Sequence, residues 1–528
     1  MSAVKKLRKR AGASFALYCL VAPLFLFIAL EIIFAAFGFP EGASTFVENI
    51  VVHEKLSTRK PPGEYRIFTY GESTIHGAGY APASSPSRWL EAYLHDFLPE
   101  KKIRVVNFGR MGQGSYFNYH SYLDTLPYKP DLVIFYMGHN TFLPGNRFDE
   151  VKQRQNTLGC RIRKWTRKSH FFSAVSRLVI QIHLRLKAGG KEEDAMEYKV
   201  IETWPSKEND RKNGISRNDP YFWQNIAFFK ENVLKIQNLS DQKKIPTLFF
   251  KPVSNLKNFP PGLSDHLKIL TREELSRWKE FYQRGKEAQK QRDFDRALSF
   301  YEQAYQIDST YATLSFRLGQ VYFQKRNFTT SLRFFEEARD NDLLICRATK
   351  ITLEILDDLQ KSGRIQLIDT EKILTYEVQG GILGEPIIED NVHFSIKGHS
   401  LVGKALAHEI AERDLITPFP KWQFNRERPY EEIFKEFNIS KDLMFLVDLR
   451  LINYFGRRYS NRIRLAHRAL AIYPNDPRAL RYLAWSYWIK GDQQKALQVY
   501  KTLHEVDPSS LAAVFSAQPS IEKAFLFL

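Results

Sequence analysis

The chain has 528 residues, of which 44% are apolar and 26% are charged. This length predicts several domains, and the composition excludes a mainly disordered, collagen-like or polytopic membrane protein. The net charge is +18, but much of the excess is local. Five basic residues lie between Lys5 and Arg10, and ten lie between Lys152 and Lys187, where no acidic residue occurs. The rest of the chain is close to neutral.

The three cysteines are too few for a disulfide framework or a zinc site made of cysteines. Cys19 lies inside an apolar run, which leaves a single Cys160–Cys346 bridge as the one pairing still open. We expect neither a metal ion nor a cofactor.

The N-terminus combines a basic tail with a long apolar run. Ala11 to Leu30 is uncharged, and apolar residues resume after Glu31. Because about 20 apolar residues span a bilayer as a helix, we predict a basic cytoplasmic tail at 1–10 and one transmembrane helix at 11–39. A cleaved signal peptide is the alternative, but the run is longer than a signal core and no small-x-small site ends it.

The segment after this run turns polar and ends in the sequence RKPPG, which predicts a stalk at 40–63. A positively charged flank stays in the cytoplasm. The remaining chain is therefore expected to be extracytoplasmic and membrane-anchored, and this compartment argues against nucleic acid as a partner.

Short apolar runs alternate with helical stretches from residue 64 and predict a parallel sheet covered on both faces. These runs are Arg66–Tyr70, Ile103–Phe108, Leu132–Met137, Ile245–Phe250 and Ile365–Ile368. Such sheets bind ligands at the carboxyl ends of their strands. We place one α/β domain at 64–415, interrupted by a basic insertion at 143–220 and a helical insertion at 264–342.

The helical insertion repeats itself every 34 residues. Its small and aromatic residues recur in the pairs Gly285 and Gly319, Ala297 and Ser331, Tyr301 and Phe335, and Ala304 and Ala338. This is the tetratricopeptide period, in which small residues let antiparallel helices pack closely and aromatic rings fill the groove between them. The same offsets recur near the C-terminus and predict a tetratricopeptide-like helical region at 416–528. Such repeats indicate a protein partner.

Polar motifs follow the first three predicted strands, and another lies late in the chain. They are Gly71-Glu72-Ser73, Asn107-Phe108-Gly109, Gly138-His139-Asn140 and Asp390-Asn391-Val392-His393. The first alone is a weak signal, because Gly and Ser are ordinary loop residues. It also differs from the G-x-S-x-G elbow of α/β-hydrolases.

Together and in this order, the motifs resemble those of the SGNH (GDSL-type) hydrolase family. The resemblance implies a flavodoxin-like, three-layer α/β fold and serine ester hydrolase activity. By this resemblance Ser73 is the nucleophile, Asp390 and His393 complete the triad, and Gly109 and Asn140 form the oxyanion hole with the backbone of Ser73. It covers residues 66–142, 221–262 and 343–413.

The sequence departs from the family pattern at two positions. Glu72 replaces the usual Asp of the first motif, and Thr141 replaces an acidic residue that often follows the Asn of the third. Neither residue is a nucleophile, base or oxyanion donor, so the departures bear on subfamily and substrate more than on activity.

The chemistry of these residue types agrees with the assignment. An Asp three residues before a His can accept the imidazole Nδ1–H while Nε2 faces the serine. Other histidines are rival bases: His76 is expected to point away from Ser73, His139 to line the pocket, and His399 to be an ordinary helix residue.

The leading hypothesis is a membrane-anchored serine esterase that removes an acyl group from an ester, such as one on a cell-envelope glycan. The alternatives are a glycan O-acyltransferase with the same triad, and a non-catalytic scaffold that binds protein partners. The basic insertion is interpreted as a solvated or lid-like helical segment. Its alternative is a surface that contacts anionic lipid or an acidic polymer.

Overall fold

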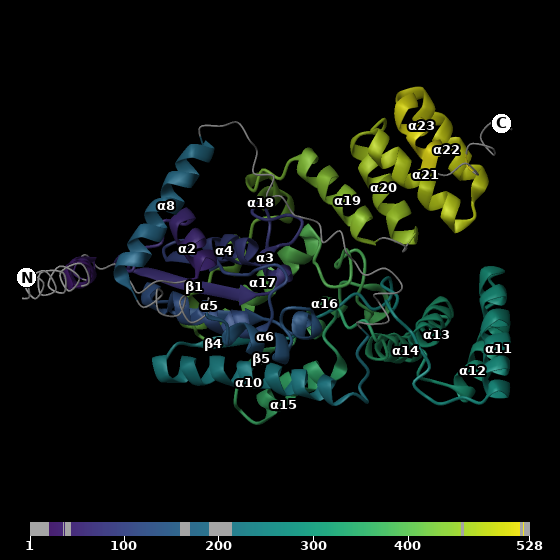
Figure 1. The fold of residues 1–528 in the computed structure, drawn as a ribbon, viewed down its shortest axis with the longest axis horizontal. Coiled ribbons are helices and arrows are strands. Elements are labelled where there is room, and N and C mark those ends of the chain that lie inside the picture. Colours follow the sequence, from purple (N-terminus) through teal and green to yellow (C-terminus); the bar gives the residue numbers. More distant parts are fainter. Residues whose placement is uncertain are drawn as a thin grey trace, which may run out of the picture.

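The computed structural model describes residues 21–34, 36, 44–158, 169–188, 214–455, 459–517 and 521. At its centre is a five-stranded parallel sheet of order β2-β1-β3-β4-β5 (Figure 1). This is the flavodoxin-like order, so the predicted α/β fold class is confirmed. The strands are β1 (Glu64–Gly71), β2 (Lys102–Asn107), β3 (Leu132–Tyr136), β4 (Thr247–Phe250) and β5 (Gln366–Ile368). Each lies within two residues of its predicted position.

The sheet is buried on both faces because its inner strands carry apolar side chains on both sides. In β3, Ile134 and Tyr136 belong to one core cluster while Val133 and Phe135 belong to the other, as the two-residue period of a strand requires. The first face is covered by α4 (Pro86–Phe97) and α17 (Ile396–Glu412). The second is covered by α2 (Thr45–His53), α5 (Ser115–Thr125), α10 (Pro220–Lys243) and α15 (Lys350–Lys361).

Shorter elements complete the sheet domain. They are α3 (Ser73–His76), α6 (Phe148–Gln155), α16 (Thr370–Thr375), α18 (Tyr430–Glu436) and the 3₁₀ turns η1 (Leu126–Tyr128), η2 (His139–Phe142), η3 (Gln379–Gly381), η4 (Phe419–Lys421) and η5 (Phe424–Arg426).

Two predicted boundaries differ from the structure. The predicted stalk at 40–63 contains α2, whose Val47 and Val51 are buried against the second face. Two valines four residues apart lie on one face of a helix. The segment as a whole is polar, so its composition did not indicate this apolar face. The sheet domain also continues past the predicted end at 415, because Trp422, Ile433 and Phe437 belong to the core of the first face.

The helical insertion forms two antiparallel pairs. They consist of α11 (Arg272–Lys290), α12 (Phe294–Ile307), α13 (Ala312–Gln324) and α14 (Phe328–Asp340). A Cβ on Gly285 would lie 2.5 Å from the Tyr301 ring, and one on Gly319 would lie 2.7 Å from the Phe335 ring. Both glycines therefore permit close helix packing, which is the reason for their 34-residue spacing.

The two ends of this insertion lie side by side. The carboxylate of Asp342 accepts the backbone N–H groups of Gly262 and Leu263, at 2.8 and 3.0 Å. The Leu343 N–H donates to the Leu263 carbonyl at 3.0 Å. One carboxylate thus joins the entry and exit of the insertion between β4 and β5.

The C-terminal helices stack beyond the sheet domain (Figure 1). They are α19 (Lys441–Phe455), α20 (Tyr459–Ile472), α21 (Pro477–Lys490), α22 (Gln493–Val506) and α23 (Pro508–Ala517). Within α19, Val447 packs into the core of the sheet domain, while Phe445 and Leu449 pack against α20 and α21. This helix therefore connects the two parts.

The described part of the predicted anchor, at 21–34, is helical, and it contacts α8 (His170–Ala188) of the basic insertion. The rings of Phe27 and Phe171 lie 6.1 Å apart, and the Glu31 carboxylate accepts the His170 N–H at 2.8 Å. Among the residues that the structure describes, no helix combines the length and apolarity needed to cross a bilayer. Residues 11–20, 35 and 37–39 of the predicted anchor, and Cys160, lie outside the described residues.

Candidate active site

Ser73 follows the carboxyl end of β1, an inner strand of the sheet, as the first residue of the short helix α3. Its side chain lies close to the surface, and the residue is 8% exposed. The N–H of a first helical residue lies outside the intrahelical hydrogen-bond ladder. At this position a ligand can reach the Ser73 hydroxyl, and the Ser73 N–H is a donor that the helix itself does not use.

Asp390 and His393 lie on a tight loop that precedes α17. The Asp390 Oδ1 atom accepts the N–H groups of Val392 and His393, at 2.9 and 2.8 Å. The loop is closed by an antiparallel bridge between Ile388 and Phe394. The carboxylate thus shapes the backbone that carries its own histidine.

The structure brings the three predicted triad residues into one chain of hydrogen bonds. The His393 Nε2 lies 2.6 Å from the Ser73 Oγ, and the His393 Nδ1 lies 2.5 Å from the Asp390 Oδ2. Burial alone would raise the pKa of Asp390, but the charge and hydrogen bonds of His393 together with the Val392 N–H lower it below its usual value. The carboxylate therefore stays ionised and accepts the Nδ1–H, which leaves Nε2 as the acceptor for the serine proton.

The predicted oxyanion donors are placed unequally. Asn140 lies in η2 at the end of β3, and its amide donates one hydrogen bond to the Gln113 carbonyl at 3.0 Å. Because an amide carries two hydrogens, the second can still serve a ligand. The Gly109 N–H instead donates to the Asn107 Oδ1 at 2.8 Å. Asn140 and the Ser73 backbone are therefore the better-placed donors.

Gly109 has a packing role that the motif did not reveal. A Cβ at this position would lie 2.5 Å from the His76 backbone nitrogen and 2.9 Å from the Ile75 side chain. Such distances are too short for any larger residue, so glycine lets the loop after β2 approach the end of α3.

Glu72 connects the nucleophile to the loop of Asn140, a role that sequence reasoning missed. Its two oxygens accept the N–H groups of Gly138 and Asn140, at 3.0 and 3.1 Å. Complete burial raises the pKa of Glu72 to about 8, although these hydrogen bonds act to lower it. A carboxylate directly before the predicted nucleophile was the available signal.

Thr141, the second departure from the family pattern, donates its hydroxyl to the Gly138 carbonyl at 2.9 Å. It therefore shapes the same loop from within.

Among the rival bases named above, His139 and His399 are buried and His76 is partly buried. His139 is 2% exposed, accepts the Ala348 N–H and contacts the Tyr136 hydroxyl, so both of its ring nitrogens have partners inside the protein. His399 contacts the Ser84 hydroxyl at 3.0 Å. Burial, with a smaller contribution from His393, lowers the pKa of His76 to about 4 and that of His399 to about 3. These rings are neutral at neutral pH.

The described residues hold no group of three His, Cys, Asp or Glu side chains arranged for a metal ion. The polar atoms at the carboxyl edge of the sheet are instead a hydroxyl, an imidazole, a carboxylate and amide donors. This set can activate a serine and stabilise an oxyanion.

The helical segments match a known family. The family model described as tetratricopeptide repeat matches residues 282–342 and 457–510. These two segments are tetratricopeptide repeats. The prediction from the 34-residue period is thereby confirmed for both parts of the chain.

Among solved structures, a lipolytic protein of the G-D-S-L family from Desulfitobacterium hafniense DCB-2 is 12% identical to this chain. It covers 65% of this chain and 98% of its own, with a TM-score of 0.26. An acetylxylan esterase from Geobacillus stearothermophilus is 10% identical over 66% of this chain and 94% of its own, with a TM-score of 0.26. A lipase/acylhydrolase from Enterococcus faecalis is 12% identical over 66% and 96%, with a TM-score of 0.28.

The superpositions are loose, so the fold and the site rest on this chain's own strand order and contacts. No curated protein matches the sequence.

Proposed function

We propose that this protein is a serine esterase of the SGNH type that hydrolyses an O-acyl ester. The observation that carries the proposal is the hydrogen-bonded chain from Ser73 through His393 to Asp390. A serine, an imidazole and a buried carboxylate in this order are the parts that acyl transfer needs.

In the proposed reaction, the Ser73 Oγ attacks the ester carbonyl while the His393 Nε2 takes the hydroxyl proton. The tetrahedral oxyanion accepts hydrogen bonds from the Asn140 amide and the Ser73 N–H. The C–O bond to the alcohol then breaks, and His393 returns its proton to the leaving oxygen. Water, activated by the same histidine, releases the acid from the acyl-enzyme and restores the serine.

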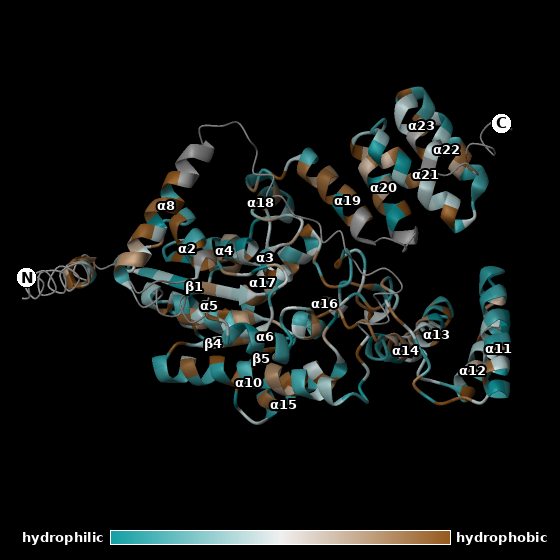
Figure 2. Cartoon of the chain, in the orientation of Figure 1, coloured by the Kyte–Doolittle hydropathy of each residue, from teal (hydrophilic) through white to brown (hydrophobic). Residues whose placement is uncertain are grey.

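We further propose that the enzyme is anchored to a membrane and acts outside the cytoplasm on an acylated glycan of the cell envelope. The basic tail and the uncharged run from Ala11 to Leu30 support the anchor. In the described part of this helix, Phe25, Leu26 and Ile32 are each more than 60% exposed. Figure 2 shows several hydrophobic residues in the coloured part of α8, which contacts this helix. A bilayer would remove these side chains from water.

The tetratricopeptide repeats are proposed to bind a protein partner. Repeats of this kind expose extended surfaces to other chains. Here they lie outside the sheet domain, so they can recruit a partner or a substrate carrier without contributing to the chemistry.

The test of the esterase proposal is turnover of short p-nitrophenyl esters by the purified full-length protein, with fluorophosphonate labelling of the nucleophile. We expect activity and a label on the peptide that contains Ser73, and neither in Ser73→Ala. Ser299→Ala, which changes an exposed serine on α12, should retain both. Continued turnover by Ser73→Ala, or a label on another serine, would refute the assignment.

A further inference from the structure

The loop that carries Asp390 and His393 is held from its outer side by a helix of the C-terminal repeats. Glu389, directly before Asp390, is 5% exposed. Its carboxylate accepts hydrogen bonds from the Arg468 Nη1 of α20, at 2.9 Å to one oxygen and 3.0 Å to the other. The Tyr80 hydroxyl donates to the same carboxylate at 3.1 Å.

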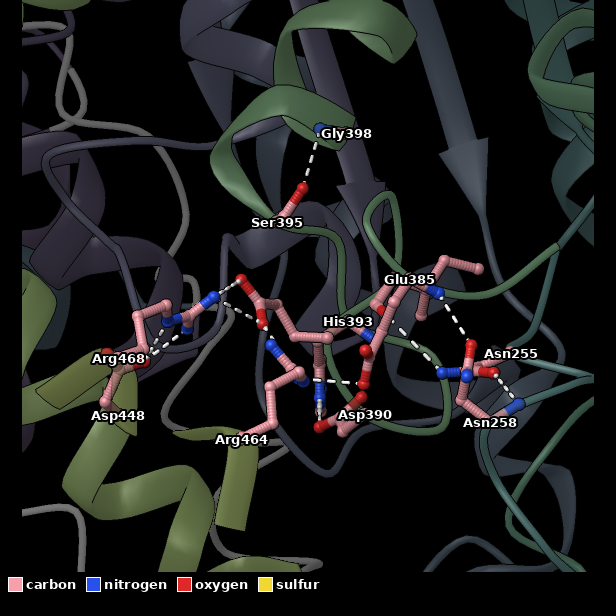
Figure 3. A network of polar contacts seen from close by, with 12 residues as sticks. Asn255, Asn258, Glu385, Asp390, His393, Ser395, Gly398, Asp448, Arg464 and Arg468 are labelled. Atoms are coloured by element: carbon pink, nitrogen blue, oxygen red, sulfur yellow. Dashed lines mark hydrogen bonds and ion pairs between the residues drawn. The ribbon is translucent and has the colours of Figure 1, made fainter. Parts of the chain in front are cut away.

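Arg468 is itself held by α19, the helix that precedes α20. Its Nε donates to the Asp448 Oδ1 of α19 at 2.7 Å, and Asp448 is 1% exposed. One turn earlier on α20, the Arg464 Nη2 lies 2.9 Å from the Glu385 Oε1 and 3.7 Å from the Glu389 Oε2. Figure 3 shows both arginines directed toward the loop of Asp390 and His393.

The backbone can transmit the position of Glu389 to the histidine. The Glu389 N–H donates to the His393 carbonyl at 2.8 Å, across the turn from one residue to the other. Behind the loop, the Asn255 N–H donates to the Asn391 carbonyl at 2.9 Å. The loop is therefore a small closed unit that is held between Asn255 on one side and α20 on the other.

A buried carboxylate that loses its cation is strongly destabilised. Without Arg468, both Glu389 and Asp448 would remain buried without their main cation. The expected response is movement of the Glu389 side chain toward water. Its backbone hydrogen bond would carry His393 with it, and a displacement of about 1 Å in a reacting group can reduce the rate about 100-fold.

We infer that Arg468, assisted by Arg464, is a positioning residue for the Asp390–His393 loop, so that docking of the C-terminal repeats sets the geometry of the candidate active site. The inference rests on the proposed esterase function for its kinetic consequence. Its structural consequence, the ordering of the loop, is independent of the substrate. The repeats thus support the site as well as offering a binding surface.

The test compares Arg468→Met with Arg478→Met in the full-length protein. Arg478 is an exposed arginine of the next helix, α21, that pairs with Asp476. Hydrogen exchange of the peptide containing residues 385–395 is measured by mass spectrometry, and kcat and KM are measured on a p-nitrophenyl ester. Arg468→Lys is included as the conservative rescue.

For Arg468→Met we expect faster exchange of the loop peptide and a kcat lowered about 10- to 100-fold, with KM nearly unchanged. Arg478→Met should match the wild type, and Arg468→Lys should recover part of the loss because it keeps one charge. Wild-type exchange and kcat in a folded Arg468→Met protein would overturn the inference, as would an equal loss in Arg478→Met.

Two further measurements keep the outcome clear. If Arg468→Met does not fold, Glu389→Gln removes the ion pairs that join the loop to Arg468 and Arg464, while it keeps the Arg468–Asp448 pair and an acceptor for Tyr80. Its exchange and kcat then decide. If the wild type hydrolyses no ester, the proposed function has failed, and the exchange of the loop peptide still shows whether Arg468 orders it.

Discussion

Glu72 precedes Ser73 in the sequence and accepts the backbone N–H of Asn140 in space, at 3.1 Å. The residue before the candidate nucleophile therefore holds the residue that can stabilise the oxyanion. The distance between these two groups is set by one buried side chain that spans from β1 to η2.

Replacing Glu72 with Gln tests this connection. The amide keeps one acceptor oxygen but turns an NH₂ group toward the other backbone donor, so one of the two hydrogen bonds is lost. We expect kcat on a small ester to fall by at least about 10-fold with little change in KM. The loss of one buried hydrogen bond should cost about 1–3 kcal/mol of unfolding free energy, measurable by urea denaturation. An unchanged kcat would mean that the loop holds its position without Glu72.

Asn140→Ala removes an oxyanion donor, together with one hydrogen bond to the Gln113 carbonyl, from a residue that is only partly buried. We expect kcat to fall about 100- to 1,000-fold, while the melting temperature stays close to that of the wild type. Gly109→Ala is the contrasting variant, because its Cβ would lie 2.5 Å from the His76 nitrogen. That variant should lose stability along with activity, and equal melting temperatures for both variants would contradict this account.

Asp390→Asn tests the orientation of the imidazole. The Asn oxygen can still accept the N–H groups of Val392 and His393, so the loop should keep its shape. Its NH₂ group, however, would face the His393 Nδ1 and favour the wrong tautomer. We expect a loss in kcat of about 10,000-fold, close to that of His393→Ala. A loss of less than 10-fold would show that Asp390 does not orient the histidine.

The buried histidines predict a pH dependence of stability. Burial lowers the pKa values of His76, His139 and His399 to about 4, 3 and 3, so below pH about 6.5 the unfolded chain binds protons that the folded chain does not. Their stabilising contribution is present above that pH and is lost as the pH falls. Glu72, with a pKa raised to about 8, acts in the opposite sense.

From about pH 4.5 to about pH 6.5 the three rings together make the unfolding free energy rise with pH. Glu72 and the other carboxyl groups whose pKa values are raised by burial oppose this rise; they are Glu91, Glu336, Glu337, Asp342, Glu385 and Asp448. His399→Phe should reduce this slope by about one proton while keeping ring contacts with Tyr80 and Phe394. Denaturation curves at a series of pH values measure both slopes. An identical slope in the variant would exclude His399 as a contributor.

The repeat insertion offers a separable variant. In Gly319→Ala the added Cβ would lie 2.7 Å from the Phe335 ring, and overpacking of this kind costs about 1–3 kcal/mol. We expect the insertion to unfold at a lower temperature while hydrolysis of a small ester is retained and action on a polymeric or protein-bound substrate weakens. Equal loss of both activities would make the insertion part of the catalytic architecture.

The sequence was sufficient for the parts of the molecule that depend on local pattern. The apolar runs predicted the positions of the five strands, and the spacing of glycines and aromatic residues predicted the positions of the repeats. The order of the motifs also predicted that Ser73, Asp390 and His393 lie close together. In each case the signal lies within a few residues or at a fixed period.

The parts that sequence reasoning missed depend on contacts between distant residues. Nothing near Glu389 indicates that its partner is Arg468, 79 residues away. Nor does the composition of residues 40–63 reveal that Val47 and Val51 cover the sheet. Both require knowledge of which surfaces meet, and this follows from packing rather than from period.

The carboxylate of Asp342 gives the repeat insertion a further property. The carboxylate ties the two ends of the insertion to each other. The distance between the points where the chain leaves β4 and returns toward β5 is therefore short and independent of the length of the insertion. Repeats can then be added or removed in pairs without changing the register of the sheet, since insertions at adjoining ends are tolerated best. The sheet domain can therefore carry repeat insertions of different length. The distance over which the repeats contact other molecules can change while the candidate active site stays the same.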